Sequence, residues 1–233
     1  MCLIVFQPKG DGVLPTFELR DAWNANPDGA GYMFARDGEL VIRKPFFKYR
    51  SLKRHYRRDF AKYGDKSPFV LHFRYATHGP KNSLNTHPHP LADGTVGLAH
   101  NGVFPWIPED TTISDTVHFC RLIEPITRES LMSRGFCEYL EDEIQWNKVV
   151  LLDNTGDYRI LNETFGHWDG DRWFSYRTMP VTVYRGYTRA GFRAWDDGEE
   201  EVEEYYGYKD EMEEASIWER VLEYEKEQEE MRK

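Results

Sequence analysis

The residues MCLIVF, positions 1–6, place a cysteine directly behind the initiator methionine and in front of four apolar residues. The run Leu3–Phe6 contains two β-branched residues and predicts a buried strand. Removal of Met1 would leave Cys2 with a free α-amino group beside its thiol. Because an α-amino group titrates at about 8, it can act as the base for that thiol. Cys2 is therefore a candidate nucleophile, the alternative being an ordinary small apolar residue.

Length and composition narrow the class of protein. A chain of 233 residues fits one globular domain with an appendage. No apolar stretch approaches a signal peptide or a membrane span, so we expect a cytoplasmic protein with no membrane partner. Three cysteines, Cys2, Cys120 and Cys137, without paired spacing disfavour a disulfide framework or a zinc site. We expect Cys120 and Cys137 to be packing residues on helices. A formal charge of −10 argues against nucleic acid as a partner.

Strand and helix patterns alternate without an internal repeat. The predicted strands cover residues 2–6, 31–35, 39–43, 68–74, 95–100, 148–153 and 157–161, and residues 168–174 predict further β structure that contains an Asp-Gly turn. The predicted helices cover residues 17–24, 51–63 and a segment that begins at Ser114, which can cap it. Asp37-Gly38 and Asn154-Thr155-Gly156 indicate hairpin turns. The fold class is therefore α+β, with helices on both faces of stacked, mostly antiparallel sheets.

Charge divides the chain into two regions. We predict a domain over residues 2–195 and an acidic C-terminal tail over 196–233, whose clustered carboxylates repel one another. Apolar residues near the end of the tail predict a terminal helix, which either packs on its own domain or binds a partner. The predicted helix 51–63 is strongly basic, and it is either a solvated face or a docking site for an acidic segment or phosphate.

Several motifs then occur in a recognisable order. HFRYATHGPKNSLNTHPH at 72–89 and LAHNGVF at 98–104 resemble the glutaminase domain of class II glutamine amidotransferases. DGAGYMF at 28–34 and SDT at 114–116 match further motifs of this family, so the resemblance covers roughly the first half of the chain. It implies an N-terminal-nucleophile (Ntn) hydrolase fold, a four-layer αββα sandwich, in which Cys2 attacks L-glutamine. No cofactor is implied.

The first long motif supplies candidate substrate-binding residues. Arg74 follows an apolar strand, and its planar guanidinium suits either the α-carboxylate of a substrate or a structural ion pair. Thr77 and His78 come next on a turn and would complete a carboxylate site, although His78 is alternatively a plain loop residue. The resemblance implies that Asp115 binds the α-ammonium group, a position that equally suits a helix start. Tyr75 stands beside the substrate site, where the best-known sugar-amidating members carry tryptophan.

Asn101 and Gly102 follow a predicted strand and by themselves indicate a turn. An Asn amide and the backbone N–H of a following glycine can also converge on a developing oxyanion. The resemblance implies this role for Asn101 and Gly102. Together with Cys2, they form the predicted catalytic set.

His87 and His89 raise the hypothesis of a metal site, because imidazoles recur at short spacing. Prolines flank His89, and no cysteine or carboxylate cluster adjoins the segment. We therefore predict no metal, and we expect Asn85 and His87 to form hydrogen bonds within the loop.

These features predict a glutaminase that forms a γ-glutamyl thioester on Cys2 and releases glutamate and ammonia. The residues after the motifs contain no recognisable synthase, so we expect a stand-alone subunit that passes ammonia to a separate synthase or transferase partner. Two alternatives remain open at this point. One is an N-terminal-cysteine hydrolase of another amide, and the other is a non-catalytic binding module of the same fold.

Overall fold

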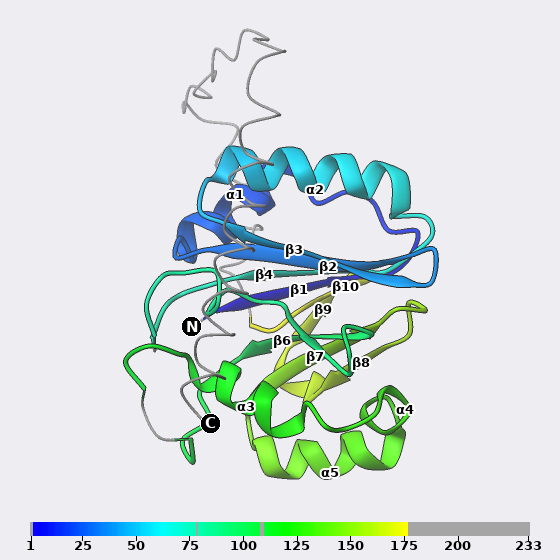
Figure 1. Cartoon of the computed structure of the whole chain (residues 1–233). Coiled ribbons are helices and arrows are strands. Elements are labelled where there is room, and N and C mark those ends of the chain that lie inside the picture. The colour runs from blue at the N-terminus through cyan, green and yellow to red at the C-terminus, as the bar shows by residue number, and fades with distance from the viewer. Residues whose placement is uncertain (1, 78, 108–109, 177–233) are drawn as a thin grey trace, which may run out of the picture. The chain divides into compact units, whose positions relative to one another are not determined.

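The computed structural model describes residues 2–77, 79–107 and 110–176. In this region two antiparallel sheets pack face to face, and helices cover the outer face of each sheet (Figure 1). The four-layer αββα arrangement is thus the one expected from the sequence. His78 and the predicted tail lie outside the described residues. No described helix has the length and apolar character needed to cross a bilayer.

The first sheet has six strands in the spatial order β3-β2-β4-β1-β10-β9. Their bounds are β1 Leu3–Gln7, β2 Ala30–Arg36, β3 Glu39–Phe46, β4 Phe69–Phe73, β9 His167–Asp169 and β10 Arg172–Phe174. Helices α1 (Thr16–Ala25) and α2 (Tyr49–Tyr63) cover its outer face (Figure 1). Asp37 and Gly38, between β2 and β3, have positive φ angles of 53° and 84°, as the predicted two-residue turn requires.

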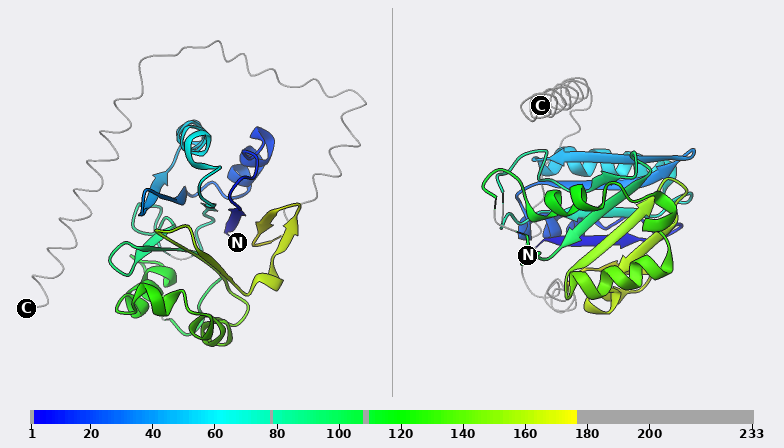
Figure 2. Two further views of the ribbon diagram at one scale, coloured as in Figure 1. Left: turned by 90° about the vertical axis from the view of Figure 1, so that its right-hand side faces the viewer. Right: turned by 60° about the horizontal axis from the view of Figure 1, so that its bottom comes forward.

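The second sheet has four strands in the order β5-β6-β7-β8. Their bounds are β5 His89–Leu91, β6 Val96–Asn101, β7 Lys148–Asp153 and β8 Tyr158–Leu161. The helices that follow or flank it are α3 Asp115–Ile123, α4 Arg128–Leu131, α5 Arg134–Ile144 and the 3-10 helix η1 Glu163–Phe165. Figure 2 shows α3 and α5 lying across this sheet. Cys120 and Cys137 are buried on α3 and α5, as expected.

The core consists of three clusters of buried residues, and successive side chains of β1 alternate between two of these clusters. Leu3 and Val5 pack in the cluster beneath α1 and α2, whereas Ile4 and Phe6 pack between the two sheets. Side chains of a strand alternate between its faces, so this pattern leaves the inter-sheet face to Cys2 at the open end of β1. The site is therefore expected between the sheets rather than under the helices.

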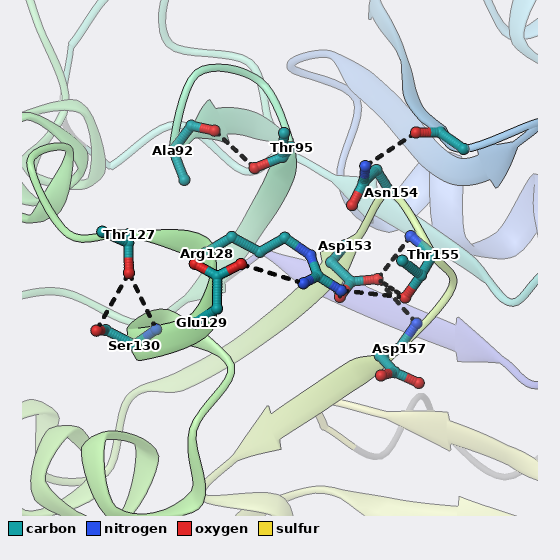
Figure 3. A network of polar contacts seen from close by, with 11 residues as sticks. Ala92, Thr95, Thr127, Arg128, Glu129, Ser130, Asp153, Asn154, Thr155 and Asp157 are labelled. Atoms are coloured by element: carbon teal, nitrogen blue, oxygen red, sulfur yellow. Dashed lines mark hydrogen bonds and ion pairs between the residues drawn. The ribbon is translucent and has the colours of Figure 1, made fainter.

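The turn between β7 and β8 is held by a buried carboxylate (Figure 3). Oδ1 of Asp153 accepts hydrogen bonds from the backbone N–H of Thr155 at 2.8 Å and of Asp157 at 3.0 Å, and from Thr155 Oγ1 at 2.7 Å. Oδ2 accepts from Arg128 Nη2 of α4 at 2.7 Å. Asp153 thereby closes the predicted hairpin and ties it to the helical layer.

Candidate functional site

The start of β1 meets the ends of three other strands at one edge of the sandwich. β1 is antiparallel to β4 with Leu3 opposite Phe73, so Cys2 and Arg74 follow as neighbours. Beyond β10, the backbone N–H of Ser175 donates to Ile4 O at 3.0 Å. The Ser175 side chain in turn contacts Asn101, the last residue of β6, at 2.8 Å. Three predicted site residues that lie far apart in sequence are thus brought together.

The Cys2 thiol is half-buried and lies against the backbone of Tyr75. The Tyr75 N–H donates to Cys2 Sγ at 3.4 Å, and the thiol donates to Tyr75 O at 3.5 Å. Burial raises the pKa of the Cys2 thiol, and the Tyr75 hydrogen bond and the Arg74 charge only partly oppose this effect. A thiol with a raised pKa is protonated at neutral pH, so nucleophilic chemistry at Cys2 needs a base.

Arg74 is buried and braces the loop that follows β4. Its Nη1 donates to Pro80 O at 2.9 Å and its Nη2 donates to Gly79 O at 3.1 Å. Its charge also acts on Cys2. Burial lowers the pKa of Arg74, and the charges of Asp28 and Asp115 only partly oppose this effect. Arg74 therefore shapes the loop and supplies a positive charge beside the thiol. Thr77, on the same loop, is exposed.

Asp28 is a site residue that the sequence patterns did not single out. It is buried, and its Oδ2 accepts a hydrogen bond from the Ala76 N–H at 2.8 Å. Its Oδ1 forms an ion pair with Lys81, and its backbone N–H donates to Arg74 O at 3.0 Å. Burial opposes ionisation of Asp28, but Lys81 and the Ala76 N–H outweigh it and lower its pKa. Asp28 thus fixes both ends of the 74–81 loop.

Asn101 and Gly102 lie where β6 ends. Asn101 is fully buried, with Nδ2 donating to Ser175 Oγ at 2.8 Å, while its Oδ1 has no hydrogen-bond partner among the described residues. Gly102 has a φ of 150°, and a Cβ at this position would lie 1.8 Å from Asn147 Oδ1. Only glycine fits this turn, because any side chain would collide with Asn147.

Asp115 begins α3 and is tied to the same turn. Its Oδ2 accepts a hydrogen bond from the Phe104 N–H at 2.8 Å, and its Oδ1 accepts from the Thr116 N–H at 2.8 Å. Ser114 caps the helix, with its Oγ accepting from the Val117 N–H at 3.4 Å, as the sequence predicted. The carboxylate that was predicted to bind an α-ammonium group is half-buried beside the Asn101-Gly102 turn.

Asn85 connects the loop to the start of α3. It is fully buried, and its Nδ2 donates to Pro80 O at 3.2 Å and to Thr112 O at 3.1 Å. Its Oδ1 accepts from the Ser114 N–H at 2.7 Å. The prediction that Asn85 hydrogen-bonds within its loop is confirmed, and the loop is thereby joined to the Asp115 region.

A cluster of buried histidines lies behind the site. The cluster consists of four buried side chains, each with an exposed fraction of 6% or less: His72, His87, His89 and His100. His87 Nδ1 accepts from the His100 N–H at 3.2 Å, so His87 bonds to β6 rather than within its loop. Burial lowers the pKa of all four, that of His72 to about 3. Over the described part of the chain, no group of three His, Cys, Asp or Glu residues is arranged to hold a metal ion.

The αββα sandwich and the residues around Cys2 resemble the glutaminase domain of the class II glutamine amidotransferases, in which an N-terminal cysteine is the nucleophile. The sequence relatives are glutamine–fructose-6-phosphate aminotransferases. The chain is 37% identical over 76 residues to the isomerizing glutamine–fructose-6-phosphate aminotransferase of Corynebacterium efficiens, which is 33% of this chain and 12% of that protein. It is 56% identical over 34 residues to the same enzyme of Aeropyrum pernix, which is 15% of this chain and 6% of the relative. The chain thus spans only a small part of these relatives.

Two further comparisons concern a solved structure and protein-family models. The solved structure of glutamine phosphoribosylpyrophosphate amidotransferase from B. subtilis, complexed with ADP and GMP, aligns over 75% of this chain and 41% of that chain. The alignment has 15% sequence identity and a TM-score of 0.44, too low to establish a shared fold by itself. No family model matches the chain.

Proposed function

We propose that this chain hydrolyses L-glutamine to L-glutamate and ammonia through a thioester on Cys2. The observation that carries the proposal is the convergence of the Cys2 thiol, the Arg74 cation and the Asn101-Gly102 turn where strands of the two sheets end. These groups come from the ends of different strands and match the needs of acyl transfer, namely a nucleophile, a substrate-orienting charge and oxyanion donors.

The reaction would begin once Met1 is removed. The free α-amine takes the Sγ proton, and the thiolate attacks the side-chain amide carbon of glutamine. The carbonyl oxygen becomes an oxyanion facing the Asn101 amide and the Gly102 N–H. The amine then returns the proton to nitrogen, the C–N bond breaks and ammonia leaves. Water, deprotonated by the same amine, cleaves the thioester and releases glutamate.

Arg74 and Asp115 would bind the two charged ends of the substrate, the α-carboxylate and the α-ammonium. Arg74 donates to the carbonyls of Gly79 and Pro80 in the substrate-free structure. A glutamine carboxylate is a stronger acceptor than a neutral carbonyl, so we expect substrate to replace at least one of these contacts. Binding of glutamine would then rearrange the 79–80 segment.

The direct test follows glutamate release from L-glutamine by the Met1-processed protein. Turnover should vanish in Cys2→Ala, and a glutamine-mimicking diazoketone should add once, at Cys2, by intact-mass analysis. Cys137→Ala is the matched control, because that thiol is buried on α5 away from the site and donates to Leu131 O. Turnover that survives in Cys2→Ala would refute the mechanism. Hydrolysis of other amides but not of glutamine would contradict glutamine as the substrate and retain the Cys2 mechanism for a different amide.

We further propose that the ammonia is passed, in the cytoplasm, to a synthase or transferase on a separate chain. The support is chemical, because free ammonia in water is protonated and lost as a nucleophile. The names of the relatives, glutamine–fructose-6-phosphate aminotransferases, join glutamine to a second substrate and are consistent with an acceptor reaction. Co-purification from the native host should retrieve an enzyme that raises glutaminase turnover. A host extract that neither binds the protein nor raises its turnover would contradict a separate partner.

A further inference from the structure

The side-chain amide of Asn101 has an unsatisfied atom in an otherwise paired environment. Its Nδ2 lies 2.8 Å from Ser175 Oγ, while its Oδ1 is buried without a partner among the described residues. The oxygen and nitrogen of an Asn amide exchange places by a half-turn of the group, and their assignment rests on the surrounding hydrogen bonds. The contacts of Ser175 therefore decide which atom faces it.

Ser175 is fully buried, and its Oγ already accepts a hydrogen bond from the Ile4 N–H at 2.9 Å. A serine hydroxyl also carries one proton to donate. If Asn101 Nδ2 faces Ser175, the hydroxyl receives two donors, and its own proton and Asn101 Oδ1 are both left without a partner. If Oδ1 faces Ser175, the hydroxyl donates to it and both of these atoms are paired, and only Asn101 Nδ2 is left without a partner among the described residues. Buried polar groups are almost always paired, and the second arrangement leaves fewer of them unpaired, so it is favoured.

We propose that Ser175 is a positioning residue for the oxyanion hole. The hydrogen bonds run in one direction, from the Ile4 N–H to Ser175 Oγ and from the Ser175 hydroxyl to Asn101 Oδ1. This orientation turns Asn101 Nδ2 away from Ser175 and leaves its two protons without an acceptor in the substrate-free structure, so that an oxyanion can take that place. Ile4 is two residues from Cys2, so one serine side chain sets the nucleophile strand and the oxyanion donor relative to each other. The catalytic consequence rests on the proposed glutaminase function.

The hydrogen-bond direction can be tested without any assay of activity. Neutron diffraction from crystals exchanged into D2O should show deuterium on Ser175 Oγ directed at Asn101, and no deuterium on the Asn101 atom that faces Ser175. Two deuterium atoms on that Asn101 atom would overturn the proposal. This result stands whether or not the protein hydrolyses glutamine.

Kinetics test the catalytic consequence. In Ser175→Ala the Asn101 amide loses its orienting donor, and kcat for glutamine should fall on the order of 10- to 100-fold, compared with about 100- to 1,000-fold for Asn101→Ala. KM should be unchanged. Adding Ser175→Ala to Asn101→Ala should lower kcat by much less than Ser175→Ala does in the wild type, because most of the effect of the serine on catalysis passes through that amide. Alkylation of Cys2 by iodoacetamide, which forms no oxyanion, should keep its rate.

The remaining outcomes separate this proposal from the proposed function. Ser175→Cys has a similar size but is only a weak hydrogen-bond donor, so it should lower kcat and replaces the alanine variant if that protein does not fold, whereas Ser175→Thr retains the hydroxyl and should retain kcat. A wild-type kcat in Ser175→Ala, or an undiminished loss when Ser175→Ala is added to Asn101→Ala, would overturn the positioning role. Absence of glutamine turnover in the wild type would instead refute the glutaminase function, with the neutron result still deciding the orientation of Asn101.

Discussion

Tyr75 contacts the sulfur of Cys2 through its main chain. Its N–H donates to Sγ at 3.4 Å, and its carbonyl accepts from the same thiol at 3.5 Å. The Tyr75 side chain is 48% exposed. The position of the Cys2 thiol is therefore set by the loop backbone rather than by the Tyr75 side chain.

Tyr75→Phe and Tyr75→Trp should leave the environment of Cys2 intact, because both contacts come from the backbone. We expect glutamate release and the rate of Cys2 alkylation to stay within about twofold of the wild type, the range of ordinary surface substitutions. Cys2→Ala provides the inactive baseline. A large loss in either Tyr75 variant would give the side chain a direct part in substrate binding or catalysis.

Gly102→Ala should abolish glutamate release and destabilise the fold. A Cβ at residue 102 would lie 1.8 Å from Asn147 Oδ1, and φ is 150°. We expect the free energy of unfolding to fall by about 1–3 kcal/mol from backbone strain, with a further loss from the clash. Gly135→Ala in α5 is the matched control, since its Cβ would meet nothing within 4 Å. That variant should gain up to about 1 kcal/mol and keep its activity, as urea titrations can show.

The buried histidines should make stability depend on pH on the acid side of neutrality. Burial lowers the pKa of His72 to about 3 and lowers those of His87, His89 and His100 as well. Below about pH 6.5 the unfolded chain binds protons at these residues and the folded chain does not, so the free energy of unfolding falls as pH falls. The expected slope is about 1.4 kcal/mol per pH unit for each histidine.

Urea titrations between about pH 6.5 and pH 5 isolate this effect, because ordinary carboxylates titrate below that window. Replacing His72 with Met should reduce the slope of unfolding free energy against pH by the contribution of one histidine, even if the substitution also lowers overall stability. A free energy of unfolding that stays constant across the window would show that the folded and unfolded chains bind equal numbers of protons, and so that burial does not lower the pKa of these histidines.

Asp153→Ala should lower stability without a direct effect on the site. It removes the acceptor for three hydrogen bonds in the β7–β8 turn and the buried partner of Arg128 (Figure 3). Removing one member of a buried ion pair costs about 3–5 kcal/mol. Glu129→Ala is the control on the same arginine, because its side chain is 77% exposed, and it should cost less than about 1 kcal/mol. Equal losses in the two variants would contradict the anchoring role of Asp153.

Local patterns predicted many elements correctly. The apolar run after Cys2 is β1, the Asp37-Gly38 turn joins β2 and β3, and Ser114 caps α3. Each signal lies within a few consecutive residues, where backbone sterics and short-range hydrogen bonds decide the conformation. Strand β5 and the bounds of α5 were not predicted, since β5 is a short strand that forms only by pairing with β6.

The motifs around Cys2, Arg74, Asn101 and Asp115 were sufficient to indicate the resemblance to class II glutamine amidotransferases and to name candidate site residues, because residue type and order carry that information. The contacts of Asp28 and Ser175 were not visible in the sequence. Ser175 meets Ile4 across 171 positions and Asn101 across 74. Such contacts depend on strand order, on register and on the packing of the two sheets against each other. These three features are determined together, because all of them follow from burying the whole apolar core. Chain order thus specified which chemical groups are present, and tertiary packing decided which of them touch.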